Sequence, residues 1–206
     1  MRNFKIAVGG MIASGKSTVV NKIVEHCPDF IKIDEYEKDD IVFNTLLKWL
    51  YEGVEDTEML LQVYFLHKHW KSQRISGFNN CVVDRHSVEH WLFAQINMKH
   101  MPQVLNMYNG LYHAYMNDIK QPDLYIILDI NFETFKKHVF KRNRPQEIEN
   151  FEKNEDYFKA LLNKYVPMIT AQCVIYDIPY VIVDANKDVD SLVEEVLKQI
   201  ESKIGK

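Results

Sequence analysis

Residues 10–17 read Gly-Met-Ile-Ala-Ser-Gly-Lys-Ser, which matches the pattern Gly-x-x-x-x-Gly-Lys-Ser. The segment follows an apolar, strand-like run at residues 4–8 and precedes residues 19–24, where aliphatic side chains recur at helical spacing. A glycine-rich turn between a strand and a helix points several backbone N–H groups, and the positive end of the helix dipole, at one position. In this context the pattern predicts a loop that binds the phosphates of a nucleoside triphosphate.

Residues of this loop have separate expected roles. Gly10 and Gly15 allow backbone conformations and a close approach to phosphate that a Cβ atom would obstruct. Lys16 supplies a mobile positive charge for the β- and γ-phosphates, and the Ser17 hydroxyl is a suitable ligand for Mg²⁺. We expect ATP, with Mg²⁺, to be bound by Gly10, Met11, Ile12, Ala13, Ser14, Gly15, Lys16, Ser17 and Thr18.

Length and composition narrow the class of protein. At 206 residues, a single α/β domain spanning residues 1–206 is the expected organisation. The formal net charge of −4 argues against a nucleic-acid binder, because phosphate contacts need a basic surface. The three cysteines lack Cys-x-x-Cys spacing, which favours a reducing compartment. No apolar run approaches membrane-spanning length and no signal peptide precedes the first strand, so we expect a cytoplasmic protein without a membrane partner.

Apolar runs typical of buried parallel strands alternate with longer segments of helical periodicity. The predicted strands are residues 4–8, 30–33, 81–83, 124–128 and 180–183, and the clearest helix covers residues 189–200. This alternation predicts a three-layer α/β sandwich, with a parallel five-stranded sheet flanked by helices. In such sheets the ligand lies beyond the carboxyl ends of the strands, so residues that follow each strand are candidates for chemistry.

Charged side chains stand at two of these strand ends. Asp34 and Glu35 follow the second predicted strand, where a carboxylate can accept the proton of an attacking hydroxyl. The alternative is that this acidic pair caps the next helix. Asp84 and Arg85 follow the third strand, where the aspartate can hold Mg²⁺ and the arginine can reach the reacting phosphoryl group. The alternative there is a surface ion pair of little energetic value.

Residues 141–147 read Lys-Arg-Asn-Arg-Pro-Gln-Glu. Clustered arginines in a polar, proline-containing loop can close over ATP and spread the charge of the transition state. The alternative is a solvated basic surface, which is the usual role of a run of charges.

Taken in order, these features resemble the deoxyribonucleoside kinase family over essentially the whole chain. The family pattern joins a phosphate loop, a Glu after the second strand, a helical Tyr and then a Gln, an acidic-Arg-Ser triplet, and an Arg-x-Arg-x-x-Glu lid. The matching residues in this chain are Glu35, Tyr51, Gln62, Asp84, Arg85, Arg142, Arg144 and Glu147.

The resemblance implies a P-loop kinase with a short Arg-rich lid that phosphorylates the 5′-hydroxyl of a deoxyribonucleoside. Glu35 would then be the general base for that hydroxyl. The amide of Gln62, which both donates and accepts, would hydrogen-bond the edge of the base. Tyr51 and Glu147 would hold the sugar 3′-hydroxyl. The resemblance also implies a homodimer packed through helices.

On the phosphate side, the resemblance implies that Ser17 and Asp84 organise Mg²⁺. The migrating phosphoryl group would be neutralised by positive charges from the loop, the third strand and the lid. Those charges belong to Lys16, Arg85, Arg142 and Arg144.

The chain departs from the family pattern at several positions. His86 stands where members usually carry Ser after the acidic-Arg pair, and Ala13 replaces a frequent Gly of the phosphate loop. His138 stands where several members have a further lid Arg. His69 and His90 occupy the positions of an Arg–Asp pair that helps to read the base in other members. Bacterial members of this length with Asp leading the triplet often act on deoxyadenosine or deoxyguanosine, which favours a purine substrate.

Other interpretations stay open from the sequence. A nucleoside-monophosphate kinase of the thymidylate kinase type would share Asp84 and Arg85, although its acceptor phosphate would meet repulsion from Asp34, Glu35 and Glu37. A non-catalytic ATP-binding switch would need only the phosphate loop. A further alternative is a zinc site built from the clustered histidines, but no thiol is placed to complete it, so polar lining of the pocket is the better interpretation.

Overall fold

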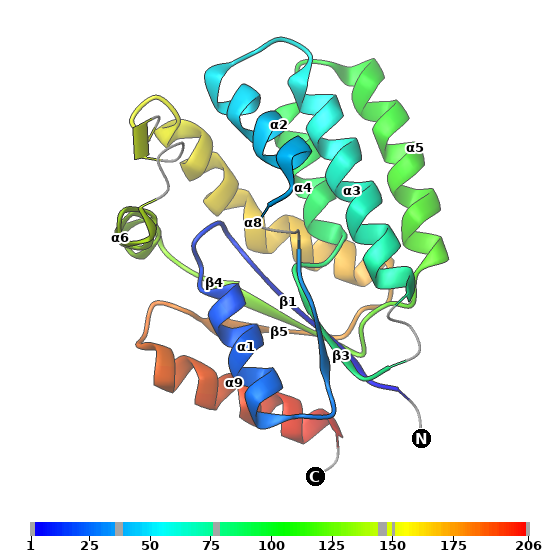
Figure 1. The fold of residues 1–206 in the computed structure, drawn as a ribbon, viewed down its shortest axis with the longest axis vertical. Coiled ribbons are helices and arrows are strands. Elements are labelled where there is room, and N and C mark those ends of the chain that lie inside the picture. The colour runs from blue at the N-terminus through cyan, green and yellow to red at the C-terminus, as the bar shows by residue number, and fades with distance from the viewer. Residues whose placement is uncertain (1–2, 36–38, 76–78, 144–147, 150, 205–206) are drawn as a thin grey trace.

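The computed structural model describes residues 3–35, 39–75, 79–143, 148–149 and 151–204 (Figure 1). Its sheet has five strands in the order β2-β3-β1-β4-β5, and each neighbouring pair runs parallel. The predicted α/β class and parallel five-stranded sheet are therefore confirmed. The strand bounds are β1 Lys5–Gly10, β2 Ile31–Ile33, β3 Cys81–Asp84, β4 Leu124–Asp129 and β5 Tyr180–Asp184.

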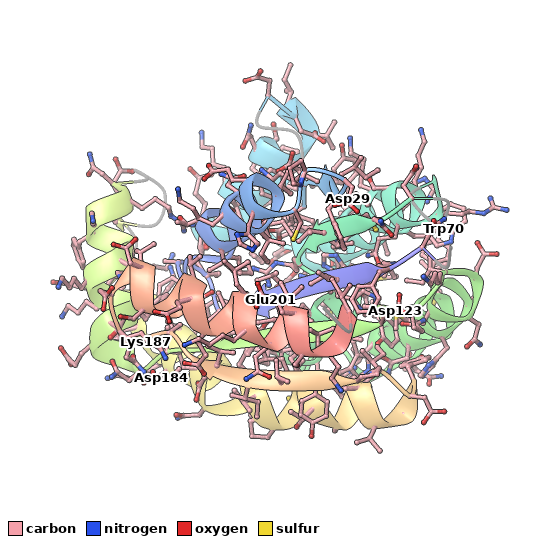
Figure 2. All side chains as sticks on the ribbon, turned by 90° about the horizontal axis from the view of Figure 1, so that it is seen from below. Asp29, Trp70, Asp123, Asp184, Lys187 and Glu201 are labelled. Atoms are coloured by element: carbon pink, nitrogen blue, oxygen red, sulfur yellow. The ribbon has the colours of Figure 1, made fainter. Side chains whose placement is uncertain are left out.

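Helices cover both faces of this sheet. Figure 1 shows α1 and α9 on one side, and α3, α4, α5 and α8 on the other. Viewed from below in Figure 2, α9 lies across the first face, where it packs on α1, β4 and β5. The bounds are α1 Lys16–His26, α2 Ile41–Glu52, α3 Thr57–Ile75, α4 Val88–Asn97, α5 Pro102–Asp118, α6 Phe132–Arg142, α8 Glu155–Ile175 and α9 Val189–Ile204.

The central strands form the core between these helix layers. Every residue of β1 is buried, as is every residue of β3 and all of β4 except its last residue. A strand covered on both faces must be apolar at successive positions rather than at alternate ones. This is why the strands were recognisable as continuous apolar runs. Within the described part of the chain, no helix is long and apolar enough to cross a bilayer.

The register of the sheet brings three segments to one edge. Val8 of β1 pairs with Asp84 of β3, and Ile33 of β2 pairs with Val83. The phosphate loop after β1, Glu35 after β2 and Arg85 after β3 therefore leave the sheet side by side. This is the carboxyl edge, where parallel α/β sheets bind their ligands.

Candidate active site

The predicted phosphate loop joins the end of β1 to the first turn of α1. Gly15 stands directly before α1 with a φ of 92°, a left-handed conformation that glycine adopts without strain. Ala13 also has a positive φ, of 59°. The alanine therefore adopts a backbone conformation that favours glycine, at the position where the family frequently has one.

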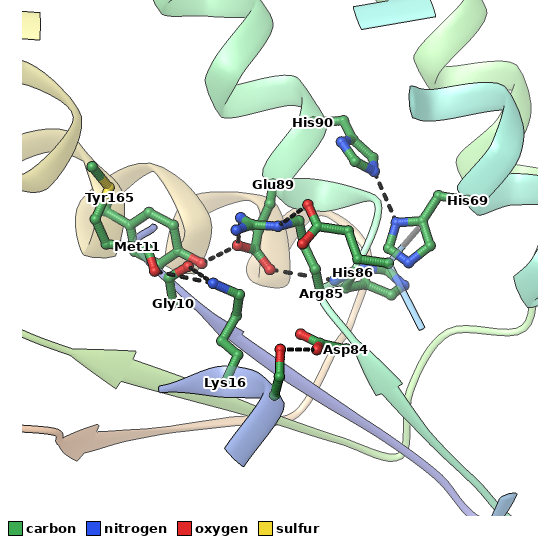
Figure 3. A network of polar contacts seen from close by, with 12 residues as sticks. Gly10, Met11, Lys16, His69, Asp84, Arg85, His86, Glu89, His90 and Tyr165 are labelled. Atoms are coloured by element: carbon green, nitrogen blue, oxygen red, sulfur yellow. Dashed lines mark hydrogen bonds and ion pairs between the residues drawn. The ribbon is translucent and has the colours of Figure 1, made fainter. Parts of the chain in front are cut away.

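The ammonium group of Lys16 lies over this loop. It donates hydrogen bonds to the carbonyl oxygens of Gly10 and Met11, at 2.9 and 3.0 Å (Figure 3). Burial, and then the neighbouring charge of Arg85, lower the pKa of Lys16 to about 8. The negative charge of a bound phosphate would favour the protonated amine.

Ser17 and Asp84 meet at the first turn of α1 and the end of β3. The Ser17 hydroxyl donates to Oδ2 of Asp84 at 2.6 Å. The other carboxylate oxygen of Asp84 is buried and has no hydrogen-bond partner among the described residues. A hydroxyl beside a carboxylate with an unpartnered oxygen is a donor set that fits Mg²⁺, which prefers oxygen ligands.

Glu35 and Arg85 form an ion pair next to this position. Nε of Arg85 lies 2.7 Å from Oε1 of Glu35, and the two side chains are 4% and 19% exposed. Burial raises the pKa of the Glu35 carboxyl, although the charge of Arg85 opposes this shift. The alternative of a surface ion pair at Arg85 is therefore wrong. The capping alternative for Asp34 and Glu35 is wrong too, because Asp40 caps α2 by accepting from the N–H of Phe43 at 2.9 Å.

Arg85 has a second acidic partner, Glu89 on the first turn of α4. Nη1 of Arg85 donates to Oε2 of Glu89, which is fully buried (Figure 3). Burial acts to lower the pKa of Arg85, but the charges of Glu35 and Glu89 outweigh it, so the pKa is raised. Sequence reasoning missed Glu89. The available signal was its position four residues after Arg85. The contact is not that of two residues on one helical face, because Arg85 precedes α4 and has a left-handed φ of 71°.

Two histidines at the positions of the family's Arg–Asp pair lie in contact. Nδ1 of His69 is 2.8 Å from Nε2 of His90, so one ring donates and the other accepts (Figure 3). Burial lowers the pKa of His69 to about 3, and it lowers the pKa values of His86 and His90 well below their usual range. All three rings are therefore neutral near pH 7. Among the described residues, no group of three or more His, Cys, Asp or Glu side chains is arranged to hold a metal.

For the other predicted site residues, the structure gives burial or exposure but no contact that tests their roles, or does not describe them. Tyr51 on α2 and Gln62 on α3 are buried side chains, and their substrate roles stay predictions. Arg142 is exposed at the end of α6. Arg144 and Glu147 lie outside the described residues, so the Arg-rich lid also stays a prediction.

His138 of α6 contacts the phosphate loop directly. Its Nδ1 lies 2.9 Å from the carbonyl oxygen of Ala13. The residue that stands in place of a further lid arginine therefore joins α6 to the loop expected to bind ATP.

Comparison with known proteins gives three kinds of match. A family model described as deoxynucleoside kinase matches residues 6–205. The chain is 35% identical to an uncharacterized protein of Mycoplasma pneumoniae, over 96% of this chain and 90% of that one. It is 31% identical to a deoxyguanosine kinase of Lactobacillus johnsonii, over 97% and 92% of the two chains. A structure of deoxyadenosine kinase from M. mycoides, with the products dCMP and dCDP bound, superposes with a TM-score of 0.79 at 26% identity, covering 97% of this chain and 99% of that one.

Proposed function

This chain belongs to the deoxynucleoside kinase family, and on that premise we propose that it phosphorylates the 5′-hydroxyl of purine deoxynucleosides with ATP and Mg²⁺. The family phosphorylates deoxynucleosides and uses ATP as the phosphate donor. The preference for purines is supported by relatives that are named deoxyguanosine kinase and deoxyadenosine kinase. The observation that carries the proposal is the Glu35–Arg85 pair, which stands beside Ser17 and Asp84 at the carboxyl edge of the sheet.

Glu35 is the general base of this proposal. Burial raises the pKa of its carboxyl, which makes the carboxylate a stronger base than an exposed glutamate. Its negative charge also favours a neutral hydroxyl acceptor over a phosphate acceptor, because two anions would repel each other. The ion pair with Arg85 fixes the direction in which the carboxylate points.

Positive charge for the phosphoryl group comes from Lys16 and Arg85. Lys16 exchanges the carbonyl oxygens of its own loop for phosphate oxygens, and the backbone N–H groups before α1 bind the same phosphates. Arg142 and Arg144 add charge from the lid. Phosphoryl transfer asks little covalent chemistry of the protein, so positioning and charge stabilisation supply most of the acceleration.

Ser17 and Asp84 are the residues that would hold Mg²⁺. The ion, when bound, neutralises charge on the β- and γ-phosphates. The unpartnered oxygen of Asp84 supports this assignment, since a buried carboxylate oxygen without a donor is costly unless a cation satisfies it.

Recognition of the nucleoside falls to α2, α3 and α4. Gln62 and the neutral pair of His69 and His90 would bind the base, because an amide and a neutral imidazole each offer both a donor and an acceptor. Tyr51 and Glu147 would hold the 3′-hydroxyl.

We also propose that residues 1–206 act as one domain, in a cytoplasmic homodimer. The homodimer is supported only by the resemblance to the family. The cytoplasmic location is supported by the positions of Cys27, Cys81 and Cys173, which include no Cys-x-x-Cys pair and so favour a reducing compartment.

The test is a screen of purified protein with ATP and Mg²⁺, in which ADP release is measured with the four deoxynucleosides and their ribose counterparts. We expect deoxyadenosine or deoxyguanosine to give the highest kcat/KM, and each ribose counterpart to be poorer. A preference for a pyrimidine would contradict the assignment of the base. The same assay is run with nucleoside monophosphates in place of nucleosides. ADP release that depends on a monophosphate and not on a nucleoside would contradict the proposed acceptor.

A further inference from the structure

The carboxylate of Glu89 is surrounded by hydrogen-bond donors. Oε1 accepts from the Tyr125 hydroxyl at 2.8 Å and from the backbone N–H of His86 at 3.3 Å. Oε2 accepts from Nη1 of Arg85 and from the Tyr165 hydroxyl (Figure 3). A fully buried acid with donors on both oxygens is held in one orientation.

Arg85 is fixed from several sides at once. Glu35 pairs with Nε and Glu89 pairs with Nη1 of its guanidinium group, and the ring of Phe93 lies 5.1 Å from Cζ. The backbone of Arg85 has a φ of 71°, a left-handed conformation that a non-glycine residue keeps only where its surroundings impose it. The surroundings of Arg85 therefore hold it in place, in a backbone conformation that an arginine does not favour by itself.

The partners of Glu89 come from distant parts of the chain. Tyr125 lies in β4 and Tyr165 in α8, and both side chains are buried. The Tyr125 hydroxyl passes close to Gly9 on its way to Glu89. Only glycine leaves room for it there, because a Cβ atom at this position would lie 2.1 Å from the hydroxyl oxygen. The network therefore ties the end of β1, which leads into the phosphate loop, to the carboxylate that holds Arg85.

We propose that Glu89 is a positioning residue, which holds Arg85 between the general base and the phosphoryl group during transfer. The inference rests on the proposed function, because Glu89 can position Arg85 for phosphoryl transfer only if Arg85 takes part in that transfer. Glu89 itself touches neither the phosphates nor the nucleoside in this proposal. The competing explanation is structural: Glu89 satisfies the N–H of His86 and two buried tyrosines at the start of α4, with no effect on transfer.

A double-mutant cycle separates the two explanations. Glu89→Gln keeps the shape of the side chain but removes its charge, so Arg85 loses one of its two anionic partners. A misplacement of about 1 Å can cost about 10²-fold in rate, and we expect a fall in kcat of that size. The KM for ATP should change by less than about threefold, because the hydrogen bonds that hold Lys16 in the loop go to Gly10 and Met11 and not to Glu89.

In a background where Arg85 is already Gln, the change Glu89→Gln should lower kcat by less than about threefold further, since residues that act as a unit are not additive. A further loss close to 10²-fold in the double variant would overturn the inference. An unchanged kcat in Glu89→Gln alone would overturn it as well. If Arg85→Gln alone leaves kcat unchanged, the proposed role of Arg85 fails instead, so the two failures are distinguishable.

Tyrosine variants keep the test valid if Glu89→Gln does not fold. Tyr165→Phe removes one donor to Glu89 and leaves both charges, so we expect a measurable fall in kcat of less than about tenfold that disappears in the Arg85→Gln background. Tyr112→Phe is the matched control, because its buried hydroxyl donates to Gln172 at 2.9 Å, away from Arg85. The control should keep its kcat. Equal losses in both tyrosine variants, or a Tyr165→Phe loss that persists without Arg85, would contradict the positioning role.

Discussion

Acidification should destabilise this protein through its buried histidines, and His69 allows the size of the effect to be worked out. The pKa of His69 is lowered to about 3 by burial, whereas an unfolded histidine has a pKa of about 6.5. Between these two values the unfolded chain binds a proton that the folded chain does not, so the free energy of unfolding falls as the pH falls. The slope is about 1.4 kcal/mol per pH unit, and the loss between pH 7 and pH 5 is about 2 kcal/mol for this one residue.

Urea unfolding followed by circular dichroism at pH 7, 6 and 5 measures this slope. The variant His69→Gln keeps a side chain that can donate and accept but removes the titrating ring, so it should lose about 2 kcal/mol less than the natural protein over this range. The depressed pKa of its neighbour His90 should leave a residual slope of the same sign in the variant.

A control is available on the surface. His26 of α1 is half exposed and lies 3.4 Å from Glu201, which is labelled on α9 in Figure 2. His26→Gln should therefore change the loss of unfolding free energy between pH 7 and pH 5 by less than about 0.5 kcal/mol. If His69→Gln retained the slope of the natural protein, His69 would not be a buried neutral ring, and its assignment to a neutral base-binding pair would fail.

Three further predictions concern the ion, a helix cap and the lid. Ser17→Ala removes a proposed Mg²⁺ ligand, so the Mg²⁺ concentration for half-maximal ADP release should rise at least about tenfold, and an unchanged Mg²⁺ titration would contradict that role. Asp40→Ala removes the cap of α2 and also the contacts of this carboxylate with the Tyr64 hydroxyl and Lys68, so a thermal melt should show a loss of at least about 1 kcal/mol, whereas an unchanged Tm would mean that these bonds are energetically unimportant. Arg144→Ala should lower kcat far more than it weakens nucleoside binding, because its charge matters most as the phosphoryl group moves, and weaker binding alone would contradict the lid role.

Features that depend on the strands could be predicted from sequence. The central strands are buried on both faces, so they appear as unbroken apolar runs that are easily located. Once the strands are known, parallel topology sends their carboxyl ends to one edge. The proximity of Lys16, Glu35, Asp84 and Arg85 then follows, because each lies at the carboxyl end of a strand or in the segment that directly leaves it.

Features that depend on helix packing could not be predicted in the same way. The contact between His69 and His90 requires α3 and α4 to pack at one particular rotation, which no local pattern specifies. The partners of Glu89 come from β4 and α8, 36 and 76 residues away in sequence. Sequence spacing shows only its relation to Arg85, four residues before it.

The sequence left open whether Asp34 and Glu35 cap the next helix, for a related reason. Several acidic residues precede that helix, and composition does not say which of them stands at its first turn. The acidic residue that reaches the N–H of Phe43 is Asp40, and Glu35 pairs instead with Arg85. Here the structure separates a structural acid from a candidate catalytic one.

The central claim is that Glu35 takes the proton of the attacking hydroxyl, and the rate of phosphoryl transfer in Glu35→Gln tests it most directly. In a single-turnover experiment with saturating ATP, Mg²⁺ and the preferred deoxynucleoside, the rate should fall by about 10²–10⁴-fold, with nucleoside binding largely retained. That fall corresponds to about 3–5 kcal/mol of activation free energy. A transfer rate close to that of the natural protein would contradict the account.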